Sequence, residues 1–454
     1  MVWFNDSLHF SSAFEACSQF EIPGVDEVVE FVMYNPAGAR CTYKRIMDGN
    51  LGYVGTDRRG DTCPLGRLSN DTLGICSNDE QKGAPPPDSC AGNPINIAIG
   101  NKFQLEVDYQ PKIFGYPDFS RSYNSLDGLW RHNYSTFIRF ATGKLALVHA
   151  DGRESFFNIV GDAVTAYPTE SGTLLKTGDN WFYTSIDNEQ YLFDAKGRLT
   201  EWRNAGGLVR KLSYGGGFIT VSSAQGQSLT FTEDSQRQPL ELSVGDMHIT
   251  YYYDNNRHLT HLIRALGTQS ERRQFHYEDP RNTGLLTGIT DERGIRFATW
   301  AYDEKGRAIS SQHSGGAGLT QVAYNTDGSS TVTNELGKTT IYQYQQIGGI
   351  KRVTSIKGEP SANCPASNSS YTYNDRGLLL TKTDAKGLVT TYDYNDRGLE
   401  ISRTEASGTT LARTTTTEWD PDRFLPIRVI EPNRITVYSY DNQGRELTRQ
   451  STSR

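Results

Sequence analysis

Histidine and carboxylate side chains are the groups in this 454-residue chain most able to carry catalysis or bind a metal. Of its eight histidines, His258 and His261 are three residues apart. On a helix that spacing makes a ligand pair, whereas on a strand the two side chains point to opposite faces. Because no third ligand lies close by in the sequence, ordinary surface or core histidines are favoured over a metal site.

Asp and Glu are numerous, but nearly all of them stand in turn positions, where a carboxylate bonds the local backbone. A glycoside hydrolase needs two carboxylates that converge in the fold, and no such pair stands out. The turns at residues 254–256 and 441–444 could bind calcium only weakly, since they lack the terminal Glu of a full calcium loop. We therefore expect no catalytic residue, no metal and no cofactor, and a chain that is not an enzyme.

Cysteine is concentrated near the N-terminus, and only Cys364 lies outside the first fifth of the chain. In a loop-like sequence this distribution favours a disulfide-stapled N-terminal region. Free thiols in a reducing compartment are the alternative, and zinc is a third, although no close Cys-x-x-Cys pair exists. The odd number of early cysteines leaves at least one thiol unpaired. The candidates for disulfides are Cys17, Cys41, Cys63, Cys76 and Cys90.

A unit with tyrosine and glycine recurs along the C-terminal half, and it determines which elements position everything else. Its aromatic residue returns about every 20–29 residues, a period typical of repeat proteins. The positions that define the repeat are Tyr302, Asp303, Gly306, Arg307, Tyr371, Tyr373, Gly377, Tyr392, Tyr394, Gly398, Tyr438, Tyr440, Asp441, Gly444 and Arg445.

Each repeat unit is predicted to be two strands and two turns. Side chains of a strand alternate between its faces, so Tyr392 and Tyr394 should share one face. The Asp or Asn that follows can bond its own backbone and open a turn. The glycine three residues later, such as Gly398, should then have positive φ. Buried phenols need partners, so a face lined with tyrosine predicts a wet or polar interior.

The fold class expected from this pattern is all-β, with repeated β-hairpins in a long twisted sheet. Helical periodicity is hard to find beyond Gly92, and Pro and Gly interrupt the chain every ten residues or so. Three segments are expected: residues 1–90, which contain the cysteines and end near a Pro-rich linker; residues 91–185, a β region; and residues 186–454, the repeat array. The array stops one strand after a turn, and the unpaired edge predicts a truncated sheet.

Composition excludes two classes of partner. The net charge of −7, without a clustered basic face, argues against nucleic acid. No apolar run approaches the roughly 18 residues of a membrane span. Residues 1–7 lack the basic start and apolar stretch of a signal peptide, so export by another route or an upstream start is expected.

The Tyr-Asp repeats with Gly-Arg turns resemble the YD repeats of Rhs (rearrangement hotspot) proteins and their teneurin relatives. Three further stretches resemble the opening of the bacterial Rhs core, and with the repeats they cover residues 90–454. They read CAGNPINIAIGNKF from residue 90, FSRSYNS from residue 119 with WRHNY from residue 130, and DGRE from residue 151.

The resemblance implies a long β ribbon that spirals into a hollow shell. In bacterial members this shell encloses a C-terminal polymorphic toxin and helps to deliver it to competing cells. The chain departs from the family pattern in lacking a recognisable PAAR-type or membrane-spanning N-terminal module and a C-terminal toxin domain. Asp420-Pro421 also lacks the Gly-Leu that completes the self-cleavage signature closing the family's core. The implied partners are therefore a toxin domain or a downstream shell segment.

Two functions from different classes follow. The first is a non-catalytic, encapsulating shell segment of an Rhs-type polymorphic toxin delivery protein, secreted or at the bacterial cell surface and serving interbacterial competition. The second is a secreted or cell-surface YD-repeat module whose tyrosine-rich face binds carbohydrate or a partner protein. The same aromatic residues are needed for the hairpins, so the pattern alone does not discriminate between the two.

Overall fold

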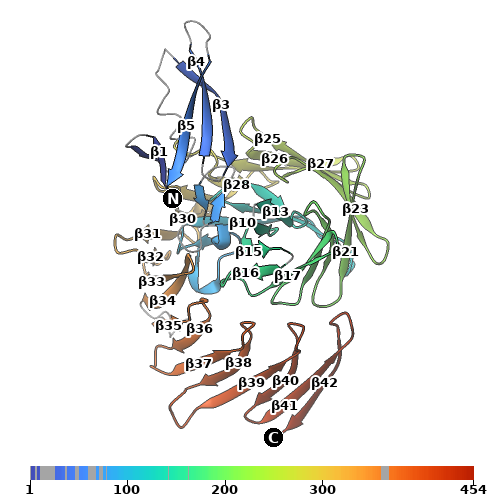
Figure 1. The fold of residues 1–454 in the computed structure, drawn as a ribbon, viewed down its shortest axis with the longest axis vertical. Coiled ribbons are helices and arrows are strands. Elements are labelled where there is room, and N and C mark those ends of the chain that lie inside the picture. Colours follow the sequence, from blue (N-terminus) through green and yellow to red (C-terminus); the bar gives the residue numbers. More distant parts are fainter. Residues whose placement is uncertain are drawn as a thin grey trace. The chain divides into compact units, whose positions relative to one another are not determined.

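The computed structural model describes residues 2–5, 8–10, 26–35, 38–45, 51–59, 68–70, 75–77, 79–141, 143–161, 163–358 and 368–454. The chain forms two compact units (Figure 1). One comprises residues 1–80 with 347–350, and the other comprises residues 81–346 with 351–454.

The first unit is built from short antiparallel strands. A five-stranded sheet has the order β2-β1-β5-β4-β3, and β6 pairs with β7. The strands are β1 (Val2–Asn5), β2 (Leu8–Phe10), β3 (Asp26–Asn35), β4 (Gly38–Arg45), β5 (Leu51–Arg59), β6 (Leu68–Asn70) and β7 (Ile75–Ser77).

The 3-10 turn η1 spans the sequence boundary between the units, and the second unit then opens with another 3-10 turn and two small sheets. The sheets have the orders β12-β11-β10-β9-β8 and β13-β14-β15-β16. The elements are η1 (Asp79–Gln81), η2 (Pro87–Ser89), β8 (Cys90–Ala91), β9 (Ile95–Asn96), β10 (Asn101–Tyr109), β11 (Phe119–Asn124), β12 (Trp130–His132), β13 (Phe137–Ala141), β14 (Lys144–Val148), β15 (Glu154–Val160) and β16 (Ala163–Ala166).

The rest of the second unit is one 26-stranded antiparallel sheet in which strands follow one another in sequence order from β17 to β42. It begins at Thr173, ahead of the start expected near residue 186. The elements are β17 (Thr173–Thr177), β18 (Asn180–Thr184), β19 (Gln190–Phe193), β20 (Leu199–Arg203), β21 (Val209–Gly215), β22 (Phe218–Ser223), β23 (Ser228–Glu233), β24 (Pro239–Val244), β25 (Met247–Tyr253), β26 (Leu259–Leu266), β27 (Gln269–His276), β28 (Gly288–Thr290), β29 (Arg296–Tyr302), β30 (Ala308–His313), the 3-10 turn η3 (Ser314–Gly316), β31 (Thr320–Tyr324), β32 (Ser330–Thr333), β33 (Thr339–Ile347), β34 (Ile350–Gly358), β35 (Ser369–Tyr373), β36 (Leu379–Thr383), β37 (Val389–Tyr394), β38 (Glu400–Glu405), β39 (Arg413–Trp419), β40 (Pro426–Glu431), β41 (Arg434–Tyr440) and β42 (Glu446–Ser453).

The repeating hairpin ends in a tight turn with a bulge. At residues 303–307, the Gly306 N–H donates to the Asp303 carbonyl at 3.0 Å, and the Asp303 N–H donates to the Arg307 carbonyl at 2.9 Å. Gly306 has a φ of 73°. The register of β29 and β30 shifts between Ala301 and Tyr302, so the extra residue of the bulge, Ile309, lies on β30 opposite the repeat tyrosine. This combination is the usual three-residue hairpin loop, with a turn followed by a left-handed residue.

Some turns of the array place another residue where glycine is expected. Asn188, Arg237 and Arg257 have φ values of 59°, 63° and 64° at the corresponding position. A side chain in this region costs about 1–2 kcal/mol relative to glycine, so these units keep the geometry at an energetic cost.

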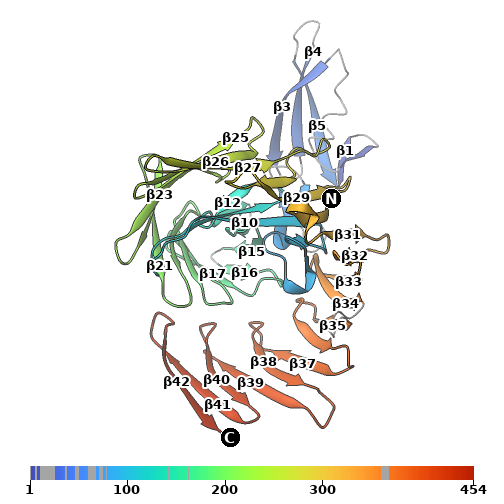
Figure 2. The same ribbon diagram turned by 180° about the vertical axis from the view of Figure 1, so that it is seen from behind.

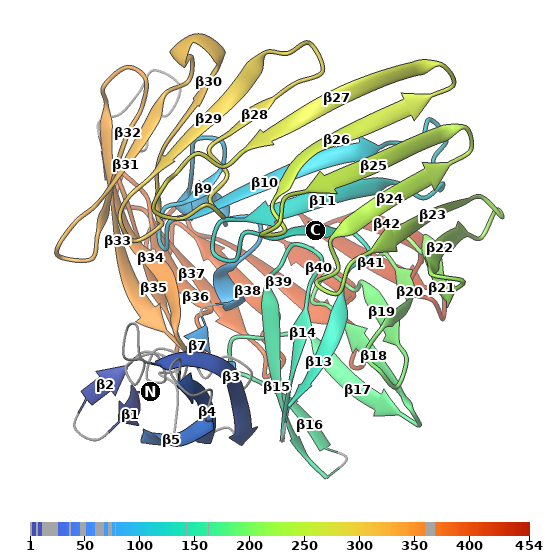
Figure 3. The same ribbon diagram turned by 90° about the horizontal axis from the view of Figure 1, so that it is seen from above.

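The core of the second unit lies on one face of the array, against strands β8 to β16, which are called the opening strands below (Figure 3). Trp130 of β12 packs edge-on against Phe275 of β27, with ring centroids 4.9 Å apart. Phe119 of β11 meets Phe231 of β23 at 5.2 Å. Array residues buried in this cluster include Val221, Leu229, Phe231, Leu242, Ile249, Leu262, Phe275, Ile289, Ala298 and Trp300.

Within the second unit, the last hairpin of the array lies against two early turns (Figure 2). The side chain of Arg445 covers Gly207 so closely that a Cβ added there would lie 2.4 Å from its Cδ. Gly444 in the same turn faces Asn188, whose Nδ2 would lie 2.9 Å from an added Cβ. Strands β17 and β42 nevertheless stand at the two ends of the sheet order. The sheet therefore winds back on itself without closing into a barrel, and the all-β prediction is confirmed.

Candidate functional site

The last tyrosine or tryptophan before many of the turns donates a hydrogen bond to the backbone of the preceding strand or of the residues just before it. The Tyr302 phenol donates to the Leu286 carbonyl at 2.7 Å, and the Trp419 indole N–H donates to the Glu400 carbonyl at 2.9 Å. Burial raises the pKa of Tyr394 and of Tyr440 to about 12, so both phenols keep the donated proton. The phenol-to-carbonyl pairs are Tyr214–Leu199, Tyr253–Pro239, Tyr302–Leu286, Tyr324–Ala308, Tyr373–Val353, Tyr394–Leu379 and Tyr440–Pro426.

The second tyrosine of each Tyr-x-Tyr pair lies beside the first. Tyr392 and Tyr394 are both half-buried while Asp393 between them is exposed, which confirms that the two rings share a face. The rings of Tyr438 and Tyr440 stack with centroids 6.4 Å apart. Tyr371 and Tyr373 flank an exposed residue in the same way. Lys382 lies over the Tyr371 ring and Arg449 over the Tyr438 ring, at 6.0 and 5.2 Å.

Both carboxylate oxygens of the turn aspartate accept hydrogen bonds from its own hairpin. Oδ1 of Asp303 accepts the backbone N–H groups of Lys305 and Arg307, each at 2.9 Å, and Oδ2 accepts Nε of Arg307 at 2.8 Å. Asp441 and Arg445 repeat this arrangement, with 2.6 Å between Oδ2 and Nε. Carboxylates held in this way have their oxygens committed to the turn. The turn glycines all have positive φ: Gly306 73°, Gly377 76°, Gly398 83° and Gly444 83°.

Arginines of successive turns reach across to the next turn. Arg376 donates to the Asp396 carbonyl at 2.8 Å, and Arg397 donates to the Arg423 carbonyl at 3.1 Å. Arg423 donates in turn to the Asp441 carbonyl at 2.8 Å. The sequence reasoning missed this row of contacts. Its signal is the recurring arginine directly before the turn glycine, as in Asp-Arg-Gly.

A buried charge cluster fastens the opening strands to the array. Arg121 of β11 is fully buried and bonds Asp108 of β10 through both Nε and Nη2, the latter at 2.9 Å. The Tyr251 phenol of β25 donates to the same carboxylate at 2.8 Å. The guanidinium also lies over the Trp130 ring at 4.8 Å. A buried ion pair needs such additional partners to offset its desolvation.

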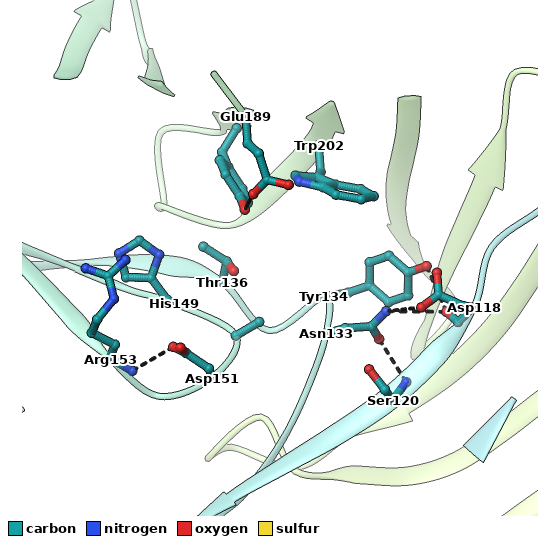
Figure 4. Close-up of a pocket in the computed structure, with 12 residues that line it drawn as sticks. Asp118, Ser120, Asn133, Tyr134, Thr136, His149, Asp151, Arg153, Glu189 and Trp202 are labelled. Atoms are coloured by element: carbon teal, nitrogen blue, oxygen red, sulfur yellow. Dashed lines mark hydrogen bonds between the residues drawn. The ribbon is translucent and has the colours of Figure 1, made fainter. Parts of the chain in front are cut away.

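A cavity of about 410 Å³ lies between the opening strands and the start of the array (Figure 4). Its first wall comes from β11 and the segment after β12. There, Nδ2 of Asn133 donates to Oδ2 of Asp118 at 3.3 Å, and the Tyr134 phenol donates to the Asp118 carbonyl at 2.8 Å. Ser120 and Thr136 complete this wall.

The second wall of the cavity is the turn between β14 and β15. The Arg153 backbone N–H donates to Oδ1 of Asp151 at 3.0 Å. Nε2 of His149 lies 2.8 Å from Oγ of Ser155. Burial, followed by the charge of Arg153, holds the pKa of His149 well below its usual value. The imidazole is therefore neutral at neutral pH.

The third wall of the cavity comes from neighbouring array strands. Tyr191 of β19 pairs across the sheet with Trp202 of β20, and its phenol donates to Oε2 of Glu189 at 2.8 Å. Together the three walls combine aromatic rings with carboxylates, an amide, hydroxyls and one guanidinium. Small-molecule sites in proteins have this size and mixture.

The two histidines three residues apart have separate partners. Nδ1 of His258 lies 3.0 Å from Oδ2 of Asp254, while the His261 ring stacks on Tyr252 with centroids 4.4 Å apart. Across the described part of the chain, no group of three or more His, Cys, Asp or Glu is placed to hold a metal ion. None of the helices in those residues is long and apolar enough to cross a membrane.

Of the cysteines expected to form disulfides, only Cys90 has a described side chain, and it is a free thiol. Burial raises the pKa of Cys90, so this thiol is held in its protonated form. The structure thus removes Cys90 from the candidate pairs. The side chains of Cys17, Cys41, Cys63 and Cys76 lie outside the described residues, so their pairing stays a prediction.

Comparison with known proteins gives two family matches. Residues 92–157 match a family described as a domain of unknown function, DUF6531, and residues 373–410 match the family described as RHS Repeat. The chain matches no curated protein sequence.

Two solved structures are similar to the chain at low identity. The crystal structure of TcdB2-TccC3-Cdc42 is 13% identical over 76% of this chain and 22% of that chain, with a TM-score of 0.29. A Tc holotoxin pore from Photorhabdus luminescens, with a mutation in TccC3, is 14% identical over 82% of this chain and 19% of that chain, with a TM-score of 0.34. The chain thus spans about a fifth of the length of these structures.

The RHS-repeat match falls on hairpins that the structure describes in full. It begins at Tyr373, includes the turn that contains Gly398 and ends after β38. The same phenol-to-carbonyl bond, bulged turn and positive-φ glycine recur outside the matched residues, for example at Tyr302 and Tyr440. The chain therefore contains RHS (YD) repeats.

Proposed function

We propose that the chain is a non-catalytic segment of an encapsulating shell in an Rhs-type toxin delivery protein that acts outside the bacterial cell or at its surface. The observation that carries the proposal is the unbroken sheet of 26 antiparallel strands, whose last hairpin lies against turns near its start. A sheet that winds in this way forms a wall. Its partners would be a toxin domain enclosed by that wall or a further shell segment.

The chemistry of the repeat supports a structural role for these residues. The phenols donate to backbone carbonyls, and the turn aspartates bond their own hairpins. The turn arginines link one hairpin to the next. The recurring positions of the unit are thus committed to holding each turn and its neighbouring strands in place, as a wall requires.

The coding DNA on both sides of this chain provides the test. We expect a downstream frame with further RHS repeats, the Asp-Pro-x-Gly-Leu signature, a variable domain and a small immunity frame. The complete product is then treated with protease beside the variable domain expressed alone. Survival of the variable domain only in the complete product supports encapsulation. Flanks that encode an export signal and no cargo would overturn the proposal in favour of a stand-alone binding module.

A further inference from the structure

The cavity between the opening strands and the array is lined by residues other than the repeat tyrosines, turn glycines and turn arginines. Its residues come from three separate parts of the sequence, around residues 118–136, 149–153 and 189–202. Its volume of about 410 Å³ lies towards the lower end of the roughly 300–1,000 Å³ found for small-molecule sites. A compact ligand with both apolar and polar faces would fit this space.

Aromatic rings form one side of the cavity. Trp202 and Tyr191 stand opposite each other on adjacent strands, and both are half-buried. Figure 4 shows the Trp202 indole at the edge of the open space, across from Asp118 and Asn133 on one side and Asp151 on the other. A flat aromatic face can pack against the C–H face of a sugar ring.

Polar groups with fixed orientations form the other sides. Hydrogen bonds inside the protein hold one oxygen of Asp118 and one of Glu189, and each carboxylate leaves a second oxygen as an acceptor. Asn133 adds an amide, whose oxygen accepts the Ser120 N–H at 3.3 Å. Closely spaced acceptors and donors suit the neighbouring hydroxyl groups of a saccharide.

The charge of the cavity limits the ligand further. Three carboxylates line it against one guanidinium, that of Arg153, which lies 3.7 Å from Glu170. The neutral His149 adds no positive charge. An anionic ligand such as a phosphate or a uronic acid would therefore be repelled, whereas a neutral or amino-bearing ligand would not.

We propose that this cavity binds a neutral or amino-substituted saccharide of one or two rings, with Trp202 as the stacking platform and Asp118, Asn133 and Glu189 as hydroxyl partners. The proposal goes beyond the shell function and does not depend on it. A wall that also holds a saccharide would let the protein attach to a glycan-bearing surface.

Saturation-transfer difference NMR on the full chain tests the proposal, with glucose, maltose, N-acetylglucosamine, chitobiose and glucosamine as probes and glucuronic acid as the anionic comparison. We expect at least one neutral or amino sugar to bind and glucuronic acid not to bind. The variant Trp202→Ala should weaken that binding about tenfold, equivalent to about 1.4 kcal/mol, and Trp202→Phe should recover part of it.

A matched control is Tyr252→Ala, which removes an exposed aromatic side chain from a strand outside the cavity and should leave saccharide binding unchanged. Circular dichroism of every variant separates lost binding from lost folding. Because Asp118→Asn keeps the size of the side chain, it provides a second disruptive variant if Trp202→Ala does not fold. No saccharide signal from the folded chain, binding unaffected by both cavity variants, or equal binding of glucuronic acid would each overturn the proposal.

Discussion

The phenol of Tyr302 donates a 2.7 Å hydrogen bond to the backbone carbonyl of Leu286, and both residues are buried. Tyr302 ends one strand of the array, while Leu286 lies just before the strand that pairs with it. The carbonyl at this place is left outside the ladder because the chain is entering a strand there. The repeat thus requires a phenol or an indole N–H, and a ring alone would leave a buried acceptor without a partner.

Replacing Tyr302 with phenylalanine is expected to destabilise the second unit. The ring would still fill its place, but the Leu286 carbonyl would lose its donor, at a cost of about 1–3 kcal/mol. Urea unfolding followed by circular dichroism measures the change. The control Tyr252→Phe removes a phenol that is 40% exposed and should change stability by less than about 0.5 kcal/mol. Equal effects of the two variants would show that the buried bond adds nothing.

The repeat pattern predicted the hairpins, the shared face of Tyr392 and Tyr394 and the positive φ of Gly398. It did not predict the acceptor of each phenol, because that carbonyl is set by the register between the strand of the tyrosine and the preceding strand. The turns at Arg237 and Arg257 lack the expected glycine, although the backbone there keeps the positive φ. A local pattern can fix a turn, whereas the partner across the sheet depends on the register of the neighbouring strand.

Alanine substitutions at two glycines with similar φ can distinguish the cost of backbone strain from the cost of a steric clash. Gly100 has a φ of 82° and Gly306 a φ of 73°. A Cβ at Gly100 would lie 2.4 Å from Cβ and 2.9 Å from Cα of Arg307, whereas at Gly306 nothing lies within 4 Å. Gly306→Ala should therefore cost only the strain of a left-handed alanine, about 1–2 kcal/mol.

Gly100→Ala should cost clearly more, because the opening segment would have to move away from the turn that contains Arg307. That movement would also weaken the bond from the Ala308 N–H to the Gly100 carbonyl, now 2.9 Å. Hydrogen exchange of the backbone amides around residues 100 and 308 measures directly whether the opening segment has moved away from this turn. If the two alanine variants unfolded at the same urea concentration, the prediction that close packing at Gly100 adds a cost would be wrong.

The strand β10 shows why the charged cluster and the cavity could not be predicted. Leu105 and Val107 are 55% and 54% exposed, whereas Glu106 and Asp108 between and beside them are buried. Alternation predicts a strand but not which of its faces is covered. Here the buried face is decided by arginines from other strands, and the cavity walls likewise come from three segments that no spacing relates.

The Asp108–Arg121 pair should behave as a buried ion pair. Arg121→Ala would leave the Asp108 carboxylate buried with only the Tyr251 phenol, at a cost of about 3–5 kcal/mol. The double variant Asp108→Leu with Arg121→Met removes both charges and should recover much of that loss. The comparison is Arg293→Ala, because the side chain of Arg293 is 74% exposed and its pair with Asp291 should be worth at most about 1 kcal/mol. Urea unfolding of the parent protein and these three variants makes the comparison, and a double variant as unstable as Arg121→Ala would contradict the expected recovery.

His149 should make stability depend on pH in a defined direction. Burial, and then the charge of Arg153, lower the pKa of its imidazole well below the usual value. Below about pH 6.5 the unfolded chain therefore binds a proton that the folded protein does not, and stability falls as the pH falls. His149→Gln removes the group that binds this proton. Its free energy of unfolding should therefore rise relative to that of the parent protein by up to about 1.4 kcal/mol per pH unit below 6.5. Free energies of unfolding measured between pH 7.5 and pH 5 give the difference. The control is His313→Gln, which replaces an exposed histidine, and its curve of stability against pH should be parallel to that of the parent protein. Parallel curves for His149→Gln as well would mean that its imidazole can take up a proton in the folded state, which the buried wall of the cavity should prevent.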